Sequence, residues 1–231
     1  MNLSYNNFIL RADFVKYSIT EACKKCGRQP ETIELLAVTK NHEVWAPEYA
    51  ARYGLHAVGE NRVQEGVDKR SKCTASLRWE LIGHLQSNKA KLAVEHFERV
   101  QSVDSIKLVE QLAKAATAQG KVLAVLLQIN AGRDPAKFGA EIEEAEALLE
   151  RAQGCASLRV EGLMTIAPLS DDKSVAQRCF ATLRDLRDTL AVKSGLPLSV
   201  LSMGMSGDLE EAVAEGSTQI RVGTALFGTR A

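Results

Sequence analysis

Ile33-Glu34-Leu35-Leu36-Ala37-Val38-Thr39-Lys40 is the stretch that says most about the fold of this chain. Its aliphatic run is typical of a buried parallel strand, and the run ends in a lysine. Long aliphatic neighbours strip water from an ammonium group and lower its pKa, which frees the amine to form a Schiff base with a carbonyl. The alternative is a lysine whose stem lies along the strand end while its charged head reaches water. Residues farther along the chain decide between these interpretations.

Short apolar runs alternate with amphipathic helical patterns along the whole chain. The runs predict strands near residues 33–38, 56–59, 79–83, 99–103, 122–130, 158–165, 198–203 and 218–222. The helical patterns cover residues 3–26, 44–53, 62–72, 88–96, 105–119, 141–153, 175–193 and 208–215. Eight strand–helix repeats favour an α/β fold, a (β/α)8 TIM barrel with an added N-terminal helix. A doubly wound open sheet is the alternative, but it requires a glycine-rich loop after its first strand, where this chain has Thr39-Lys40-Asn41-His42.

Length and charge limit the classes of protein to which the chain can belong. It has 231 residues, 45% hydrophobic and 25% charged, which suits one barrel. We therefore expect a single domain over residues 1–231, with a helix within residues 1–30 packed on the barrel. Lys+Arg and Asp+Glu are equal at 29 each, so no net charge favours binding of nucleic acid or a membrane surface. No run approaches the roughly 18 apolar residues of a membrane span.

The five cysteines are an odd number, which indicates reduced thiols rather than a disulfide framework. Cys23 and Cys26 have the spacing of a redox or zinc motif, but they follow a helical pattern and no preceding strand. A second pair that would complete a zinc site is missing. The amino terminus also has no apolar signal segment. We expect a cytoplasmic protein without a metal site.

Polar residues follow each of the predicted strands. In a barrel the carboxyl ends of the strands meet at one rim, where ligand sites lie. Residues at these positions include Lys40, Asn61, His84, Asp104, Asn130, Thr165, Ser206 and Thr224. Their convergence predicts a ligand site at this rim.

Glycines and small hydroxyl residues follow the last two predicted strands. They are Gly204, Ser206, Gly207, Gly223 and Thr224. Barrels often bind phosphate on backbone N–H groups of these two loops, which glycine lets a ligand approach closely. Turn chemistry explains either loop alone, but both loops across the rim from Lys40 favour phosphate. A phosphate and a Schiff-base lysine together imply a phosphorylated aldehyde, and pyridoxal 5′-phosphate is the obvious candidate.

Six motifs between Leu35 and Arg230 carry a resemblance to a known family. They are LAVTK (36–40), GENRVQE (59–65), IGHLQSNK (82–89), GLMT (162–165), LSMGMS (201–206) and GSTQIRVGTALFG (216–228). Together they resemble the pyridoxal phosphate homeostasis proteins (the YggS/PROSC family), single-domain relatives of bacterial alanine racemase. The resemblance implies a fold-type III barrel that holds pyridoxal 5′-phosphate as a Schiff base with Lys40.

The same resemblance implies roles for individual residues. It places Ser206, Gly223 and Thr224 around the phosphate, and Arg221 opposite the pyridine nitrogen. The residues that it places around the ring are Val38, Asn61, His84 and Met203. The chain departs from the family pattern in Thr39, where serine is usual, in residues 41–44, and in Asp134, where glutamate is usual.

Catalysis and storage of the cofactor make different demands on the chain. Racemisation needs an acid and a base on opposite faces of the substrate. In alanine racemase a tyrosine from a second domain of the partner subunit serves one face. Here the sequence ends at Ala231, and its tyrosines all precede the second predicted strand: Tyr5, Tyr17, Tyr49 and Tyr53. We expect neither that domain nor that tyrosine.

Arg221 gives a second reason to expect weak catalysis. Its guanidinium has donors only, so a ring nitrogen that it contacts stays unprotonated and is a weak electron sink. We therefore expect no catalytic residue, but a monomer that stores or delivers pyridoxal 5′-phosphate and regulates vitamin B6 and amino- and keto-acid balance. We expect the cofactor as a partner, and apo enzymes that require it as candidate recipients. Two alternatives stay open, a pyridoxal-dependent racemase-like enzyme and an aldolase-like barrel that uses Lys40 on a sugar phosphate.

Overall fold

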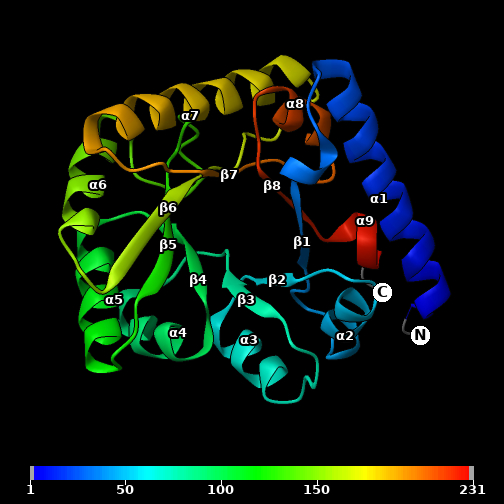
Figure 1. Cartoon of the computed structure of the whole chain (residues 1–231), viewed down its shortest axis with the longest axis horizontal. Coiled ribbons are helices and arrows are strands. Elements are labelled where there is room, and N and C mark those ends of the chain that lie inside the picture. Colours follow the sequence, from blue (N-terminus) through cyan, green and yellow to red (C-terminus); the bar gives the residue numbers. More distant parts are fainter. Residues whose placement is uncertain (1–2, 229–231) are drawn as a thin grey trace.

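Eight parallel strands close into a barrel in chain order, because β8 pairs with β1 as well as with β7. The computed structural model describes residues 3–228, so both ends of the predicted 1–231 domain lie outside the described residues. The strands are β1 (Glu34–Val38), β2 (Ala57–Glu60), β3 (Arg78–Leu81), β4 (Arg99–Val103), β5 (Leu123–Gln128), β6 (Leu158–Met164), β7 (Val200–Ser202) and β8 (Gln219–Val222). Figure 1 shows them as a ring at the centre of the molecule.

Helices surround this ring, and one α-helix follows each strand (Figure 1). They are α1 (Tyr5–Cys26), α2 (Trp45–Arg52), α3 (Val63–Arg70), α4 (Ala90–His96), α5 (Ile106–Ala118), α6 (Ala145–Gln153), α7 (Lys173–Ser194), α8 (Leu209–Ala214) and α9 (Thr224–Phe227). Short 3-10 helices precede β1, α4 and α6, at η1 (Pro30–Thr32), η2 (Ser87–Lys89) and η3 (Ile142–Glu144).

The leading helix α1 is defined by its caps and by its buried face. The Ser4 side chain accepts a hydrogen bond from the Asn7 N–H at 3.3 Å and caps the start of the helix. Gly27 ends the helix in the left-handed conformation, with φ of 70°. The buried face packs against α8 and α9, and the ring of Phe8 stacks on that of Phe227 at 5.3 Å between centroids. Helix α1 therefore covers the outside of the barrel beside its last strands (Figure 1).

Side chains of the strands alternate between the helices outside and the interior of the barrel. Leu35 and Ala37 of β1 belong to the large core shared with the helices. A separate apolar cluster, formed by Leu36, Val38, Ala57 and Ile82, lies inside the barrel. The barrel is thus a filled core, and its carboxyl-terminal rim carries the open space described below.

The architecture confirms the barrel prediction and excludes the open sheet, since an open sheet would leave β1 and β8 unpaired with each other. All eight strands lie within a few residues of their predicted positions. Helix α9 was not predicted: Thr224 was assigned to a phosphate loop, and residues 225–227 were assigned to no helix or strand. The prediction also treated the strands as near-continuously apolar, whereas several carry charged residues into the interior.

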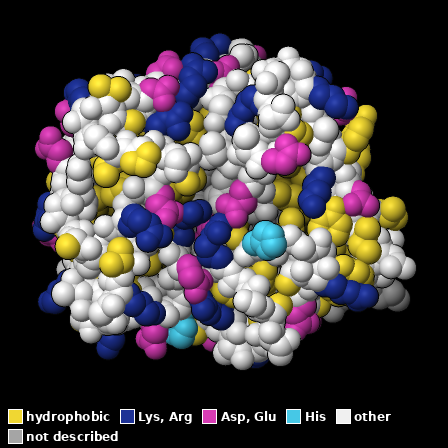
Figure 2. Space-filling model, in the orientation of Figure 1, with side chains coloured by type: hydrophobic (Ala, Val, Ile, Leu, Met, Phe, Trp, Pro, Cys, Tyr) yellow, Lys and Arg dark blue, Asp and Glu magenta, His cyan; other side chains and the backbone are white. Residues whose placement is uncertain are grey.

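Charges of both signs are intermixed on the face drawn in Figure 2. This agrees with the equal numbers of acidic and basic residues in the sequence. Within residues 3–228, no helix is both long enough and apolar enough to cross a bilayer.

Candidate functional site

A cavity of about 640 Å³ opens at the carboxyl-terminal ends of the strands. Residues from the loops after β1, β2, β3, β7 and β8 contribute to its wall. The lining residues are Val38, Lys40, His42, Asn61, Ile82, Gly83, His84, Gln128, Phe138, Ile166, Met205, Ser206, Gly207, Arg221, Gly223, Thr224 and Gly228. A volume of this size is in the range of small-molecule sites.

Lys40 lies on this wall, two residues after the end of β1. The strand is buried on both faces, so it delivers the lysine to the rim from a rigid support. The next residue, Asn41, has a positive φ of 58°, a left-handed conformation in which the chain turns sharply toward α2. The sharp turn keeps Lys40 at the mouth of the barrel.

The two predicted phosphate loops line the same cavity as Lys40. Ser206 and Gly207 follow β7, and Gly223 and Thr224 follow β8. The loop after β7 is fixed by Lys173 of α7, whose Nζ donates to the Gly207 carbonyl at 2.8 Å. A methyl group at the Cβ position of Gly207 would meet no atom within 4 Å, so this backbone faces open space. Hydroxyl groups and accessible backbone on one wall suit a phosphate.

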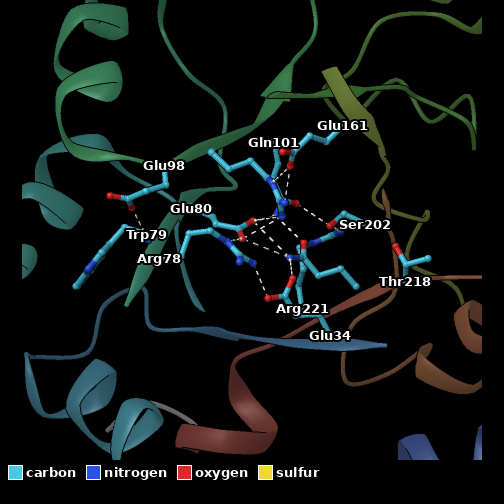
Figure 3. A network of polar contacts seen from close by, with 12 residues as sticks. Glu34, Arg78, Trp79, Glu80, Glu98, Gln101, Glu161, Ser202, Thr218 and Arg221 are labelled. Atoms are coloured by element: carbon cyan, nitrogen blue, oxygen red, sulfur yellow. Dashed lines mark hydrogen bonds and ion pairs between the residues drawn. The ribbon is translucent and has the colours of Figure 1, made fainter. Parts of the chain in front are cut away.

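Arg221 of β8 reaches the floor of the cavity from the interior of the barrel. Its Nη1 donates to Ser202 Oγ at 2.8 Å (Figure 3). Its Nη2 donates to the Thr165 carbonyl, also at 2.8 Å. Desolvation lowers the pKa of Arg221 to about 10, and Asp208 opposes this shift. The guanidinium therefore remains a cation near neutral pH, with donors and no acceptor to offer a ligand.

A network of charged and amide side chains lies next to Arg221 in the interior of the barrel (Figure 3). Glu80 is its hub and accepts hydrogen bonds from Arg78 Nε at 2.7 Å and from Arg99 Nη1 at 3.1 Å. Gln101 donates to Glu80 at 2.5 Å and accepts from Ser202 at 2.6 Å, which joins the network to Arg221. The floor of the cavity is thus supported by paired polar groups.

His84 and Phe138 form a second wall of the cavity. Their rings stack at 4.1 Å between centroids with 13° between planes. His84 Nδ1 also lies 3.4 Å from Asp104 Oδ2, so two of the predicted strand-end residues meet here. The Gln128 amide donates to the Phe138 carbonyl at 2.9 Å, while its buried Oε1 has no hydrogen-bond partner in the described part of the chain. A bound ligand with a donor group would satisfy that oxygen.

Eight of the nine residues predicted to bind a cofactor line this one cavity. They are Lys40, Val38, Asn61, His84, Ser206, Arg221, Gly223 and Thr224. Met203 does not line it, because side chains alternate along β7 and Ser202 points inward. Met203 is consequently fully buried in the core shared with the helices. Asn130 also stays out of the lining, since its side chain bonds to the backbone of Asp134.

Residues 17–231 match the family model described as the N-terminal domain of alanine racemase. The pyridoxal phosphate homeostasis protein of Pseudomonas aeruginosa is 40% identical over 92% of this chain and 91% of its own length. The chain belongs to the family of pyridoxal phosphate homeostasis proteins. The member from Escherichia coli K12 is 39% identical over 94% of both chains.

A solved structure of a family member carries the cofactor. PipY of Synechococcus elongatus, with pyridoxal phosphate bound, is 39% identical to this chain and has a TM-score of 0.80. The alignment covers 91% of this chain and 100% of PipY. The family resemblance inferred from the six motifs is therefore confirmed, together with the barrel.

Several lining residues were not predicted from the sequence. Ile82, Gly83 and Met205 lie next to predicted site residues inside the family motifs, so the motifs themselves held the signal. Ile166 directly follows Thr165, one of the predicted strand-end residues, so its position also carried a signal, whereas Phe138 lies in the loop after β5, outside the six motifs. Among residues 3–228, no cluster of three or more His, Cys, Asp or Glu side chains suits a metal ion.

Proposed function

We propose that this protein binds pyridoxal 5′-phosphate at the carboxyl-terminal rim of its barrel, stores or delivers it, and so regulates vitamin B6 and amino- and keto-acid balance. One observation carries the proposal: Lys40 and the loops that hold Ser206 and Thr224 line the same cavity. An amine and a hydroxyl-and-glycine wall match the two ends of a phosphorylated aldehyde. Family membership at 40% identity supports the same function.

Each wall of the cavity has a distinct part in this proposal. Ser206, Gly223 and Thr224 hold the phosphate, and the Lys40 amine links covalently to the aldehyde. The side chains that enclose the ring are Val38, Asn61 and His84. When bound, the cofactor supplies an electrophilic carbonyl and a conjugated ring. The protein supplies orientation, and the stacked rings of His84 and Phe138 form one wall of the site.

Arg221 is the reason to propose storage rather than strong catalysis. As a cation with donors only, it requires the facing ring nitrogen to accept and to stay unprotonated. Such a ring withdraws electrons weakly, which disfavours chemistry that generates a carbanion. None of the four tyrosines lines the cavity; Tyr5 and Tyr49 instead pack edge to face on each other, at 5.0 Å between centroids.

A racemase-like activity is the second candidate, and one observation favours it. His84 lies on the cavity wall within 3.4 Å of Asp104, an arrangement that can hold and move a proton. Turnover of an amino acid well above that of the free cofactor, abolished in His84→Asn, would support this candidate over storage.

We further propose that the protein acts as a cytoplasmic monomer, with apo enzymes that require the cofactor as recipients. Its five cysteines, Cys23, Cys26, Cys73, Cys155 and Cys179, are all free thiols, which suits a reducing compartment.

Borohydride reduction tests the proposal directly. Purified protein is incubated with pyridoxal 5′-phosphate, reduced, digested and analysed by mass spectrometry to locate the modified lysine. We expect the label on Lys40 and loss of the visible absorption band in Lys40→Ala, with Lys89→Ala as an exposed control at the same rim. A label on another lysine, or a protein without affinity for the cofactor, would overturn the proposal.

A further inference from the structure

A buried charged cluster lies outside the barrel, behind the turn that carries Lys40. It consists of Glu60 at the end of β2 and of Glu65 and Lys69 on α3, and we call it the Lys69 cluster. Lys69 Nζ lies 2.5 Å from Glu60 Oε1 and 3.2 Å from Glu65 Oε1. Glu60 is fully buried and Lys69 is 6% exposed. Glu60 and Glu65 both belong to the motif GENRVQE, to which the proposed function assigns only Asn61.

The Lys69 cluster contacts the backbone on both sides of Lys40. On one side, Lys69 Nζ donates to the Thr39 carbonyl at 2.7 Å, and Thr39 Oγ1 donates to Glu60 at 2.6 Å. On the other side, the Asn41 backbone N–H donates to the Glu65 carboxylate. The residues before and after Lys40 are therefore both bonded to side chains of the cluster.

Asn41 occupies the left-handed position of this turn. Its φ is 58°, a conformation that asparagine adopts more readily than most residues with a side chain. The turn is closed by the His42 N–H, which donates to the Thr39 carbonyl at 3.1 Å. The bond from the Asn41 N–H to Glu65 adds a restraint on the side of the turn that faces α3.

Stability alone does not account for the Lys69 cluster. Removing two charges from water is costly, and replacing a buried ion pair by apolar residues of similar volume is often neutral or stabilising. Glu60 also leaves Oε2 buried without a hydrogen-bond partner among the described residues. Burial raises the pKa of Glu60, although Lys69 and Thr39 oppose the shift. A cluster with these costs calls for a role beyond stability.

We propose that Lys69 and Glu65 are positioning residues that hold the Thr39–Asn41 turn so that the Lys40 amine meets an aldehyde ligand in the cavity. This inference rests on the proposed function. In the reaction concerned, the neutral Lys40 amine adds to the aldehyde carbon, its two N–H hydrogens pass to the aldehyde oxygen, and this oxygen leaves as water, so that a C=N bond replaces the C=O bond. The Lys69 cluster takes no part in these bond changes, since it lies on the outer side of the turn. It acts only through the backbone of Thr39 and Asn41.

The test compares two ligands that differ only in the aldehyde. Binding of pyridoxal 5′-phosphate depends on both the phosphate loops and the imine bond. Pyridoxine 5′-phosphate has an alcohol in place of the aldehyde, so its affinity depends on the phosphate loops without the imine bond. In Lys69→Met we expect the imine band to form at least about tenfold more slowly. Affinity for pyridoxine 5′-phosphate should stay within about twofold. Lys72→Met, exposed and three residues away, is the matched control and should change neither value.

Glu65→Ala keeps the inference testable if Lys69→Met does not fold, because Glu65 is only partly buried. It removes the acceptor of the Asn41 N–H, and we expect the same selective loss. Glu65→Gln retains an acceptor oxygen and should restore the rate of imine formation. If imine formation and affinity for pyridoxine 5′-phosphate fall equally, the cluster has a general structural role. If the rate of imine formation is unchanged in both Lys69→Met and Glu65→Ala, the cluster does not position Lys40. Either result overturns the inference. If the wild-type protein binds neither ligand, the proposed function fails instead.

Discussion

Arg221 donates a hydrogen bond of 2.8 Å to Ser202 Oγ, and this hydroxyl donates its own proton to Gln101 at 2.6 Å. Because the proton of Ser202 is committed to Gln101, a lone pair of its oxygen faces the guanidinium. The position of Arg221 on the cavity floor is therefore set from inside the barrel. No other side chain in the described residues holds it by a hydrogen bond, since its second bond goes to the Thr165 carbonyl.

Arg221→Glu should change the visible spectrum of the protein loaded with pyridoxal 5′-phosphate. A carboxylate at this position can pair with a protonated ring nitrogen, which the wild-type arginine cannot. Absorbance spectra recorded across neutral pH check this, with Arg178→Glu on the exposed face of α7 as the control. An identical spectrum in Arg221→Glu would contradict the placement of Arg221 opposite the ring nitrogen.

Ser206→Ala and Thr224→Val should each weaken cofactor binding by about 1 to 3 kcal/mol, the value of a hydrogen bond to a charged group. Equilibrium dialysis with pyridoxal 5′-phosphate measures the change. Thr182→Val is the matched control, because its hydroxyl bonds only to the Arg178 carbonyl of its own helix. Wild-type affinity in both variants would remove these residues from the phosphate site.

Gly83→Ala should lower both stability and cofactor affinity. A Cβ at Gly83 would lie 2.2 Å from the Asn61 carbonyl oxygen, so the backbone of Asn61, a lining residue, must move. We expect a loss of more than about 2 kcal/mol in the free energy of unfolding, measured in urea. In the control Gly154→Ala the nearest atom is at 3.4 Å, an ordinary contact. Equal stability of the two variants would show that the close approach of Gly83 to Asn61 is unimportant.

Glu161→Gln should lower stability in a pH-dependent way. Burial alone would raise the pKa of Glu161, but attraction to Arg99 and bonding to Arg159 outweigh it and hold the pKa below its usual value. Because the folded-state pKa is the lower one, the carboxylate stabilises the fold above about pH 4.5, and this contribution is lost as the pH falls. The stabilisation by Glu161 should therefore decrease as the pH is lowered.

We therefore expect Glu161→Gln to cost about 1 to 3 kcal/mol at neutral pH and progressively less toward pH 3. Urea denaturation at several pH values measures the difference from wild type. Glu150→Gln, exposed on α6, is the control and should show no such trend. A difference for Glu161→Gln that stays constant with pH would argue against the pairing.

The sequence was sufficient to predict the barrel and the rim. Strand-like runs such as residues 33–38 and 218–222 are separated by helical patterns, a repeat that fits a closed barrel or a doubly wound open sheet, and the lack of a glycine-rich loop after the first strand favoured the barrel. Once the barrel is assumed, Lys40, Ser206 and Thr224 must lie at one end, because parallel strands share their carboxyl-terminal direction. Their meeting in one cavity follows from topology and needs no knowledge of side-chain conformation.

The interior network was missed, although β3 and β8 carried a signal. Arg78 and Glu80 alternate with apolar residues in β3, and Gln219 and Arg221 do so in β8. That alternation places polar groups on one face, but a single strand does not reveal which residues face it across a barrel. The same alternation explains Met203, which follows the inward-facing Ser202 and so points to the helices.

Glu80 accepts hydrogen bonds from Arg78, Arg99 and Gln101. Replacing any one of these residues leaves a buried charge or hydrogen-bond donor without a partner. We therefore expect single substitutions at these positions to destabilise the fold. Folded variants should carry several substitutions there that compensate for one another. Aligned homologues should show these sites covarying as one block. A library that randomises them jointly should yield folded barrels that site-by-site saturation would never reach.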